Sequence, residues 1–181
     1  MIYTIGHSTR PLAEFIDLLQ VHAVRRLADV RTVPRSKRHP HFAAPALEAS
    51  LAAVGIEYRH FPALGGLRKP RKDSANSAWR VEGFRGYADY METAAFDRAL
   101  ESLLEFATLP TAVMCAEAVW WRCHRQLIAD ALVARGIDVR HITSSSPAAS
   151  HTLTAFATVI GTEVRSPGPG VRLEVRYPGL V

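Results

Sequence analysis

The feature that most constrains the fold is the alternation of short apolar strand-like segments with amphipathic helical segments. Residues 2–6, 27–30, 57–61, 111–115 and 138–143 have the composition and length of strands. Residues 12–19, 46–54, 93–107 and 126–135 place apolar side chains at helical spacing. Strands that alternate with helices usually form a parallel sheet. We therefore predict an α/β fold with three layers, in which a mostly parallel sheet of about five strands is flanked by helices.

The composition is that of one globular domain. The chain has 181 residues, of which 48% are hydrophobic and 22% charged. No apolar run is long enough to span a membrane, and the N-terminus does not resemble a signal peptide. We expect a cytoplasmic protein with no membrane partner, whose two cysteines are reduced.

Two regions lie outside the regular alternation. Residues 62–86 form the longest stretch predicted to be irregular. After residue 143, a serine-rich loop precedes residues 153–160, which fit a helix or a strand equally well. A turn is expected at residues 166–170. Residues 171–177 alternate apolar and charged side chains, which predicts a half-buried strand that can form an antiparallel sheet edge.

Positive charge is concentrated in two predicted loops, and the net charge is +5. The first loop contains Arg31, Arg35, Lys37 and Arg38, and the second contains Arg68, Lys69, Arg71 and Lys72. Clustered positive charge favours an anionic partner, either nucleic acid or a phosphorylated small molecule. The aromatic and arginine side chains of residues 79–90 are compatible with base stacking or with packing onto the sheet. The alternative interpretation of the two basic clusters is that they are solvated loops without a partner.

The carboxyl ends of parallel strands share one edge of the sheet, where ligands bind in α/β folds. The residues that we expect at or near this edge are His7, Ser8, Asp29, Arg31, Gly65, Gly66, Cys115, Glu117, Arg122, Cys123, His124, Arg125 and His141.

The two thiols are the leading candidates for chemistry. Cys115 ends an apolar strand and is either a core residue or a reactive group. Cys123 opens a helix beside Arg122, His124 and Arg125, a setting that favours a thiolate. The two cysteines can also form a transient disulfide if the loop between them folds back. Seven residues separate them, which is not a standard zinc spacing, so we assign no metal ligands.

Each of the remaining candidates also has a purely structural interpretation. Glu117 and His7 can transfer protons, or can anchor an arginine and fix a turn. Asp29 and Arg31 can bind substrate, although a structural ion pair between them is the simpler interpretation. The glycine fingerprints of dinucleotide and P-loop sites are absent, so the sequence identifies no cofactor.

Six short motifs occur in an order that resembles the domain-of-unknown-function 488 family. They are Thr4-Ile-Gly-His-Ser8, Asp29-Val-Arg31, Leu64-Gly-Gly66, Cys115-Ala-Glu117, Cys123-His-Arg125 and His141-Ile142. The resemblance covers about residues 2–142 and leaves 143–181 as an extension. It implies a compact α/β domain in a bacterial cytoplasmic protein and groups the edge residues into one site. It implies no activity.

Three hypotheses follow. The first is an enzyme in which Cys115 or Cys123 reacts with a phosphate-bearing substrate, with Glu117 or His7 handling protons and Arg31, Arg122 and Arg125 holding phosphate. The second is a nucleic-acid-binding module without chemistry, and the third is a metal site built from cysteine and histidine. We favour the first because the predicted edge combines a nucleophile, an acid, a histidine and arginines.

Overall fold

The computed structural model describes residues 1–36, 38–164 and 170–179 and has a central six-stranded sheet. The strand order is β3-β2-β4-β1-β5-β6, and all neighbours are parallel except the antiparallel pair β5 and β6. The strands are β1 (Ile2–Gly6), β2 (Arg26–Asp29), β3 (Glu57–His60), β4 (Thr111–Cys115), β5 (Val139–Ile142) and β6 (Ala149–Ser150). The predicted α/β fold is confirmed.

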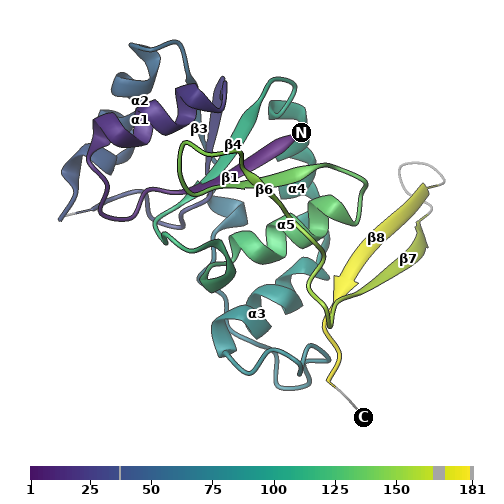
Figure 1. The fold of residues 1–181 in the computed structure, drawn as a ribbon. Coiled ribbons are helices and arrows are strands. Elements are labelled where there is room, and N and C mark those ends of the chain that lie inside the picture. Colours follow the sequence, from purple (N-terminus) through teal and green to yellow (C-terminus); the bar gives the residue numbers. More distant parts are fainter. Residues whose placement is uncertain (37, 165–169, 180–181) are drawn as a thin grey trace.

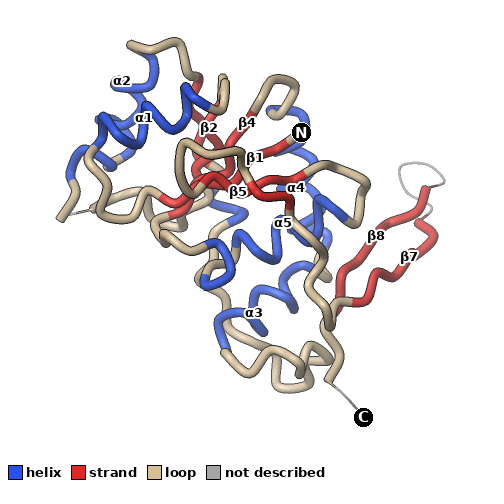
Figure 2. Tube along the Cα trace, in the orientation of Figure 1, coloured by secondary structure: helices blue, strands red, loops and turns tan. Residues whose placement is uncertain are grey.

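Helices cover both faces of this sheet (Figures 1 and 2). The helices are α1 (Leu12–Val21), α2 (Ala44–Ala52), α3 (Glu82–Met91), α4 (Ala94–Phe106) and α5 (Arg125–Val133). Short 3-10 turns are η1 (Pro40–Phe42), η2 (Pro62–Leu64) and η3 (Trp120–Arg122). Helices α1 and α2 pack on one face, whereas α3, α4 and α5 contribute to the core on the other.

Alternate strand residues supply the two apolar layers, as the two-residue period of a strand requires. Ile5 and Met114 point toward Phe15 on the α1 side. Val113 and Cys115 point toward the layer of α4 and α5. Cys115 therefore lies at the end of a buried strand and on the same side of the sheet as α5.

The chain reverses its direction across the sheet at the carboxyl ends of β1 and β4. From β1 the chain passes through α1 to β2, and from β4 it passes through α5 to β5, so the connections leave on opposite faces. Neighbouring strands whose connections part in this way leave a crevice at their carboxyl ends, which is where α/β folds bind ligands. His7 and Cys115 lie at this position.

Helix α3 differs from the prediction of an irregular stretch over residues 62–86. It begins at Glu82 and contains Gly83 and Gly86, whose low helix propensity obscured its pattern. Gly86 is buried because its helix packs against the backbone of Arg68 and Lys69, where a Cβ atom would lie 2.6 Å from the Arg68 carbonyl oxygen.

The C-terminal region forms a separate hairpin of β7 (Thr158–Val164) and β8 (Gly170–Arg176), which lies beyond α5 in Figure 1. The predicted strand is therefore present and pairs antiparallel with β7, while β6 provides the antiparallel edge of the main sheet. Most of the predicted turn at residues 166–170 falls outside the described residues. In the described part of the chain, no helix has the length and apolar character needed to cross a membrane.

Candidate active site

Backbone pairing continues past the ends of β1 and β4 and fixes the floor of the crevice. The His7 N–H donates to the Cys115 carbonyl at 3.0 Å, and the Ser8 N–H donates to the Ala116 carbonyl at 2.9 Å. Ser8 then turns the chain with a φ of 50°. Gly6 is required here, because a Cβ atom would overlap the carbonyl oxygen of Glu117. The first motif of the sequence thus shapes the backbone around the thiols.

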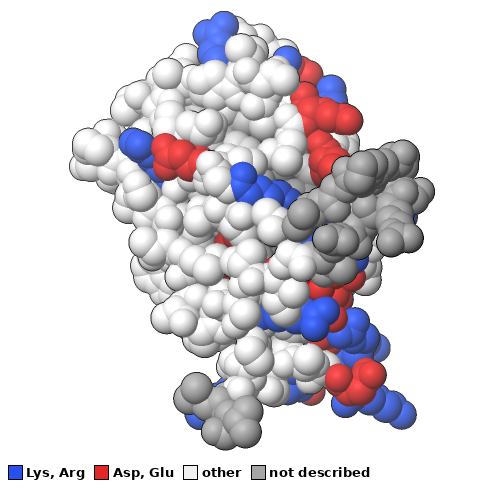
Figure 3. Space-filling view, turned by 90° about the vertical axis from the view of Figure 1, so that its right-hand side faces the viewer, with Lys and Arg blue, Asp and Glu red and all other residues white. Residues whose placement is uncertain are grey.

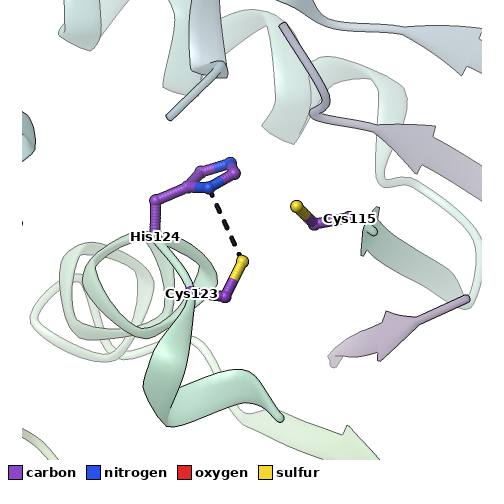
Figure 4. Close-up of side chains that lie close together, drawn as sticks. All are labelled: Cys115, Cys123 and His124. Carbon is purple, nitrogen blue, oxygen red and sulfur yellow. Dashed lines mark hydrogen bonds between the residues drawn. The ribbon is translucent and has the colours of Figure 1, made fainter. Parts of the chain in front are cut away.

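Cys115, Cys123 and His124 form one compact cluster (Figure 4). Their two sulfur atoms and one ring nitrogen all lie within 4.8 Å of one another. The Cys123 Sγ lies 3.6 Å from Nδ1 of His124, at hydrogen-bond distance for sulfur. β4 supplies Cys115, while the turn after η3 supplies the other two, so the close approach depends on the tertiary fold. The structure thus brings the two predicted cysteines together.

The ring of His124 is held on two sides. Its Nε2 lies 3.2 Å from the carbonyl oxygen of Val30, which can only accept, so the proton is assigned to Nε2. Nδ1 then faces Cys123, where it can accept the proton of the thiol and leave a cationic ring beside the thiolate. On the opposite side the ring packs against Gly66, where a Cβ atom would lie 2.4 Å from Nδ1. Gly66 therefore leaves room for the histidine.

The two thiols have opposite tendencies to ionise. A hydrogen bond from Cys115 lowers the pKa of Cys123, and His124 and Arg125 lower it further against the effect of burial. The same hydrogen bond, together with burial, raises the pKa of Cys115. The favoured state is one thiolate at Cys123 that accepts a hydrogen bond from a neutral Cys115.

Arg125 places a positive charge beneath this pair. Its side chain is 1% exposed and donates to the carbonyl oxygens of Glu117 and, at 3.5 Å, Ala118. Its Nε has no hydrogen-bond partner, and within the described residues no carboxylate forms a salt bridge with it. A buried guanidinium without a carboxylate favours an anion nearby, which the Cys123 thiolate provides.

His7 and Arg31 are tied into a network centred on Asp29. Arg31 forms a two-pronged ion pair with the buried Asp29, with an Nη2–Oδ2 distance of 2.5 Å, and Tyr58 donates to the same carboxylate at 2.7 Å. Nη1 of Arg31 lies 3.3 Å from Nε2 of His7. Burial lowers the pKa of His7 to about 4, so the ring is neutral at neutral pH. The geometry favours a positioning role for Asp29 and His7.

A cavity of about 460 Å³ opens above the cluster, within the range of small-molecule sites. The polar residues that line it are His7, Arg31, Thr32, Arg35, Ser36, Glu117, Arg122, Cys123 and His124. Arg35 and Arg122 are exposed and form no salt bridge with any described residue. One carboxylate, Glu117, faces three arginines here, so the cavity suits an anion.

Some predicted site residues lie near the cavity without lining it. Gly65 packs its backbone against Thr32, where a Cβ atom would lie 2.4 Å from the hydroxyl oxygen. Ser8 and Asp29 act through the backbone turn and the ion pair described above. Gly65, Ser8 and Asp29 therefore shape the site from outside the residues that line its opening.

His141 is buried and belongs to a second polar network under the site. Its Nδ1 lies 2.7 Å from the Thr4 hydroxyl and its Nε2 lies 3.0 Å from His151, which in turn contacts Asp130 at 2.9 Å. The Trp120 ring stacks on His141 at 3.9 Å. This network supports the η3 turn that carries Arg122 toward the cavity.

Sequence reasoning did not identify all residues around the opening. It placed Arg35 in a basic loop but not at the thiol site, and it did not include Ser36, Val33, Leu67 or Val81. Their segments have no strand or helix pattern, so no local signal indicates that they lie at the opening.

Two arginines of the second basic loop contact other groups of the protein itself. Arg68 donates to the carbonyl oxygens of Gly65 and Ala63 and lies 3.7 Å from the ring centre of Tyr90. Arg71 pairs with Glu92 at 2.5 Å. On the face that carries the hairpin, basic and acidic side chains of the described residues lie close to one another (Figure 3).

Comparisons with known proteins bear on this site through the family alone. No curated protein and no solved structure matches the chain significantly. A family model described as "Domain of unknown function DUF488" matches residues 11–132, which include both cysteines and most of the cavity. The chain therefore belongs to the DUF488 family.

Proposed function

We propose that the protein is a thiol enzyme that binds a small phosphate-bearing substrate in the cavity and attacks it with Cys123. The observation that carries this proposal is that the Cys123 thiol, held beside Cys115 and His124, lines one cavity together with three arginines. These arginines are Arg31, Arg35 and Arg122. Arginine side chains bind phosphate oxygens through charge-assisted hydrogen bonds. A thiolate held among them is an activated nucleophile.

The reaction is a displacement at phosphorus. As the bond from the Cys123 sulfur to phosphorus forms, the ester P–O bond breaks, and its electron pair leaves with the ester oxygen. That oxygen takes a proton from Glu117 or from water, since the cavity is open to solvent. A water molecule then attacks the phosphorus and gives a proton to Glu117 or to solvent. The S–P bond breaks, its electron pair returns to the Cys123 sulfur as the thiolate, and phosphate is released.

In this proposal the two cysteines have different tasks. Cys123 lies between His124 and Cys115 and is the attacking group. Cys115, at the end of β4, donates its hydrogen bond to the thiolate and positions it. Arg125 compensates the negative charge from below, because it has no carboxylate of its own.

The test is phosphate release from a panel of organic phosphate monoesters, with mass spectrometry of the enzyme during turnover. We expect release by the wild type, a phosphoryl adduct on Cys123, and loss of both in Cys123→Ser. Cys115→Ser keeps a hydrogen-bond donor at that position. Phosphate release by this variant should therefore fall less than phosphate release by Cys123→Ser. Equal release by wild type and Cys123→Ser would refute the proposal.

A second candidate is a metal site on the same cluster. Among the described residues, Cys115, Cys123 and His124 are the group whose ligand atoms lie close enough for a metal ion. The Nε2–H of His124 points to a backbone carbonyl, as is usual for a histidine ligand. Stoichiometric zinc in untagged protein, found by elemental analysis, would favour this candidate over a free thiolate.

Binding to a nucleic-acid polymer stays a prediction. The internal contacts of Arg68 and Arg71 reduce the charge that the second basic loop can offer to a polymer. The cavity volume of about 460 Å³ instead suits a small ligand. Retention of nucleic acid at low salt, with a steep loss as salt rises, would support a polymer as substrate.

A further inference from the structure

One half of the cavity is lined by apolar side chains, which offer a phosphate group neither charge nor hydrogen bonds. Val33 is 58% exposed, Leu67 is 80% exposed and Val81 is 59% exposed, yet all three line the same opening. Phe84 is partly buried beside them and stacks on Trp79 at 4.8 Å. Exposed apolar side chains that gather around one hollow mark a binding site.

The two halves of the cavity come from different segments. The loop after β2 provides Arg31, Arg35 and Val33, so it contributes to both halves. Leu67 comes from the loop after η2, and Val81 precedes α3. A ligand with a charged end at the arginines and thiols therefore has its other end among aliphatic side chains from three segments.

From this arrangement we infer that the ligand is a phosphate monoester of a compact hydrocarbon group, aryl or alkyl. The inference rests on the proposed function and deepens it by naming the substrate class. Val33, Leu67, Val81 and Phe84 offer no side-chain hydrogen-bond donor or acceptor to the far end of the ligand. A nucleobase has polar edges that would lose water there without gaining partners, which costs binding free energy.

Charge complementarity decides which end of the ligand lies deeper. The inner wall holds Arg31, His7 and the two cysteines, while the exposed aliphatic side chains form the outer rim. The phosphate therefore reaches the thiolate, and the hydrocarbon group covers the opening. Covering the opening also excludes water from the reacting atoms and strengthens the electrostatic contacts below.

The test is calorimetric binding of phosphonates to the full chain, because their C–P bond is not a substrate for the displacement. The probes are methylphosphonate, butylphosphonate, phenylphosphonate and the 5′-phosphonate analogue of adenosine. We expect butylphosphonate or phenylphosphonate to bind about tenfold tighter than methylphosphonate, since each buries additional apolar area. Tighter binding of the adenosine analogue than of both hydrocarbon phosphonates would overturn the inference and leave the proposed function standing.

Neutral substitutions separate the two halves. Leu67→Asn and Val81→Asn do not change charge, so each should weaken phenylphosphonate binding about threefold or more and leave methylphosphonate binding unchanged. Leu109→Asn is the matched control, because Leu109 is 49% exposed and does not line the cavity. Phenylphosphonate binding as tight in both variants as in the wild type would overturn the inference.

Two further outcomes are informative. No binding of any phosphonate, together with no phosphate release, would refute the proposed function itself. If Leu67→Asn instead converts a dimer to a monomer in analytical ultracentrifugation, the rim is an interface between two copies and the inferred ligand class is wrong.

Discussion

Replacing Gly66 with alanine tests how tightly the site holds His124. The added Cβ atom would lie 2.4 Å from Nδ1 of the ring, so the ring must retreat by about 1 Å to reach ordinary contact near 3.4 Å. The φ angle at Gly66 is not in the left-handed region, so the cost is steric rather than conformational. Overpacking of this kind costs about 1–3 kcal/mol. For a chain of this size, that lowers Tm by about 2–4 °C per kcal/mol.

The same displacement should slow alkylation of Cys123, because Nδ1 of His124 leaves its position 3.6 Å from the sulfur. Gly83→Ala is a matched control in the same cavity: a Cβ atom there meets nothing within 4 Å. Since Gly83 lies in α3, that change should raise the stability by up to about 1 kcal/mol and leave Cys123 reactivity unchanged. Thermal unfolding and mass spectrometry measure both effects. Wild-type Tm and alkylation rate in Gly66→Ala would refute this account of the ring.

Two further predictions concern the buried polar groups. Asp130→Ala should lower the free energy of unfolding by about 3–5 kcal/mol in urea denaturation, because Asp130 accepts from His151 and Tyr177 in the interior; a loss below 1 kcal/mol would contradict it. Burial lowers the pKa of His7 to about 4 and that of His141 to about 3 in the folded protein. The unfolded chain therefore takes up protons first as the pH falls below about 6.5, so stability should be full above that value and decline toward pH 4 and below. Urea midpoints that do not change between pH 7 and pH 4.5 would contradict this prediction.

The order of strands and helices was predictable because each element carries a local pattern. Residues 2–6 and 111–115 are mostly apolar, and both are buried strands with the predicted bounds. Helix α3 was not predictable in this way, because its stability comes from packing of Tyr87 and Ala88 in the core rather than from helix propensity.

The candidate site was predictable in part for a related reason. Strand ends mark the edge of a parallel sheet, so Cys115 and His7 could be placed together from the sequence. The contact of Gly66 with His124 depends on how a long loop returns to the sheet, which no local pattern encodes. Likewise the apolar rim joins segments that have no common periodicity.

The presence of an activated thiolate at Cys123 is tested most directly by the rate of alkylation of this residue from pH 5 to 10, measured by mass spectrometry on the folded wild type. We predict a thiolate at Cys123 that reacts well below the reference pKa of about 8.5, while Cys115 reacts slowly. In Cys115→Ala, loss of the hydrogen-bond donor should move the Cys123 profile toward higher pH. A wild-type profile centred at or above about pH 8.5 would contradict the claim that the cluster holds an activated thiolate.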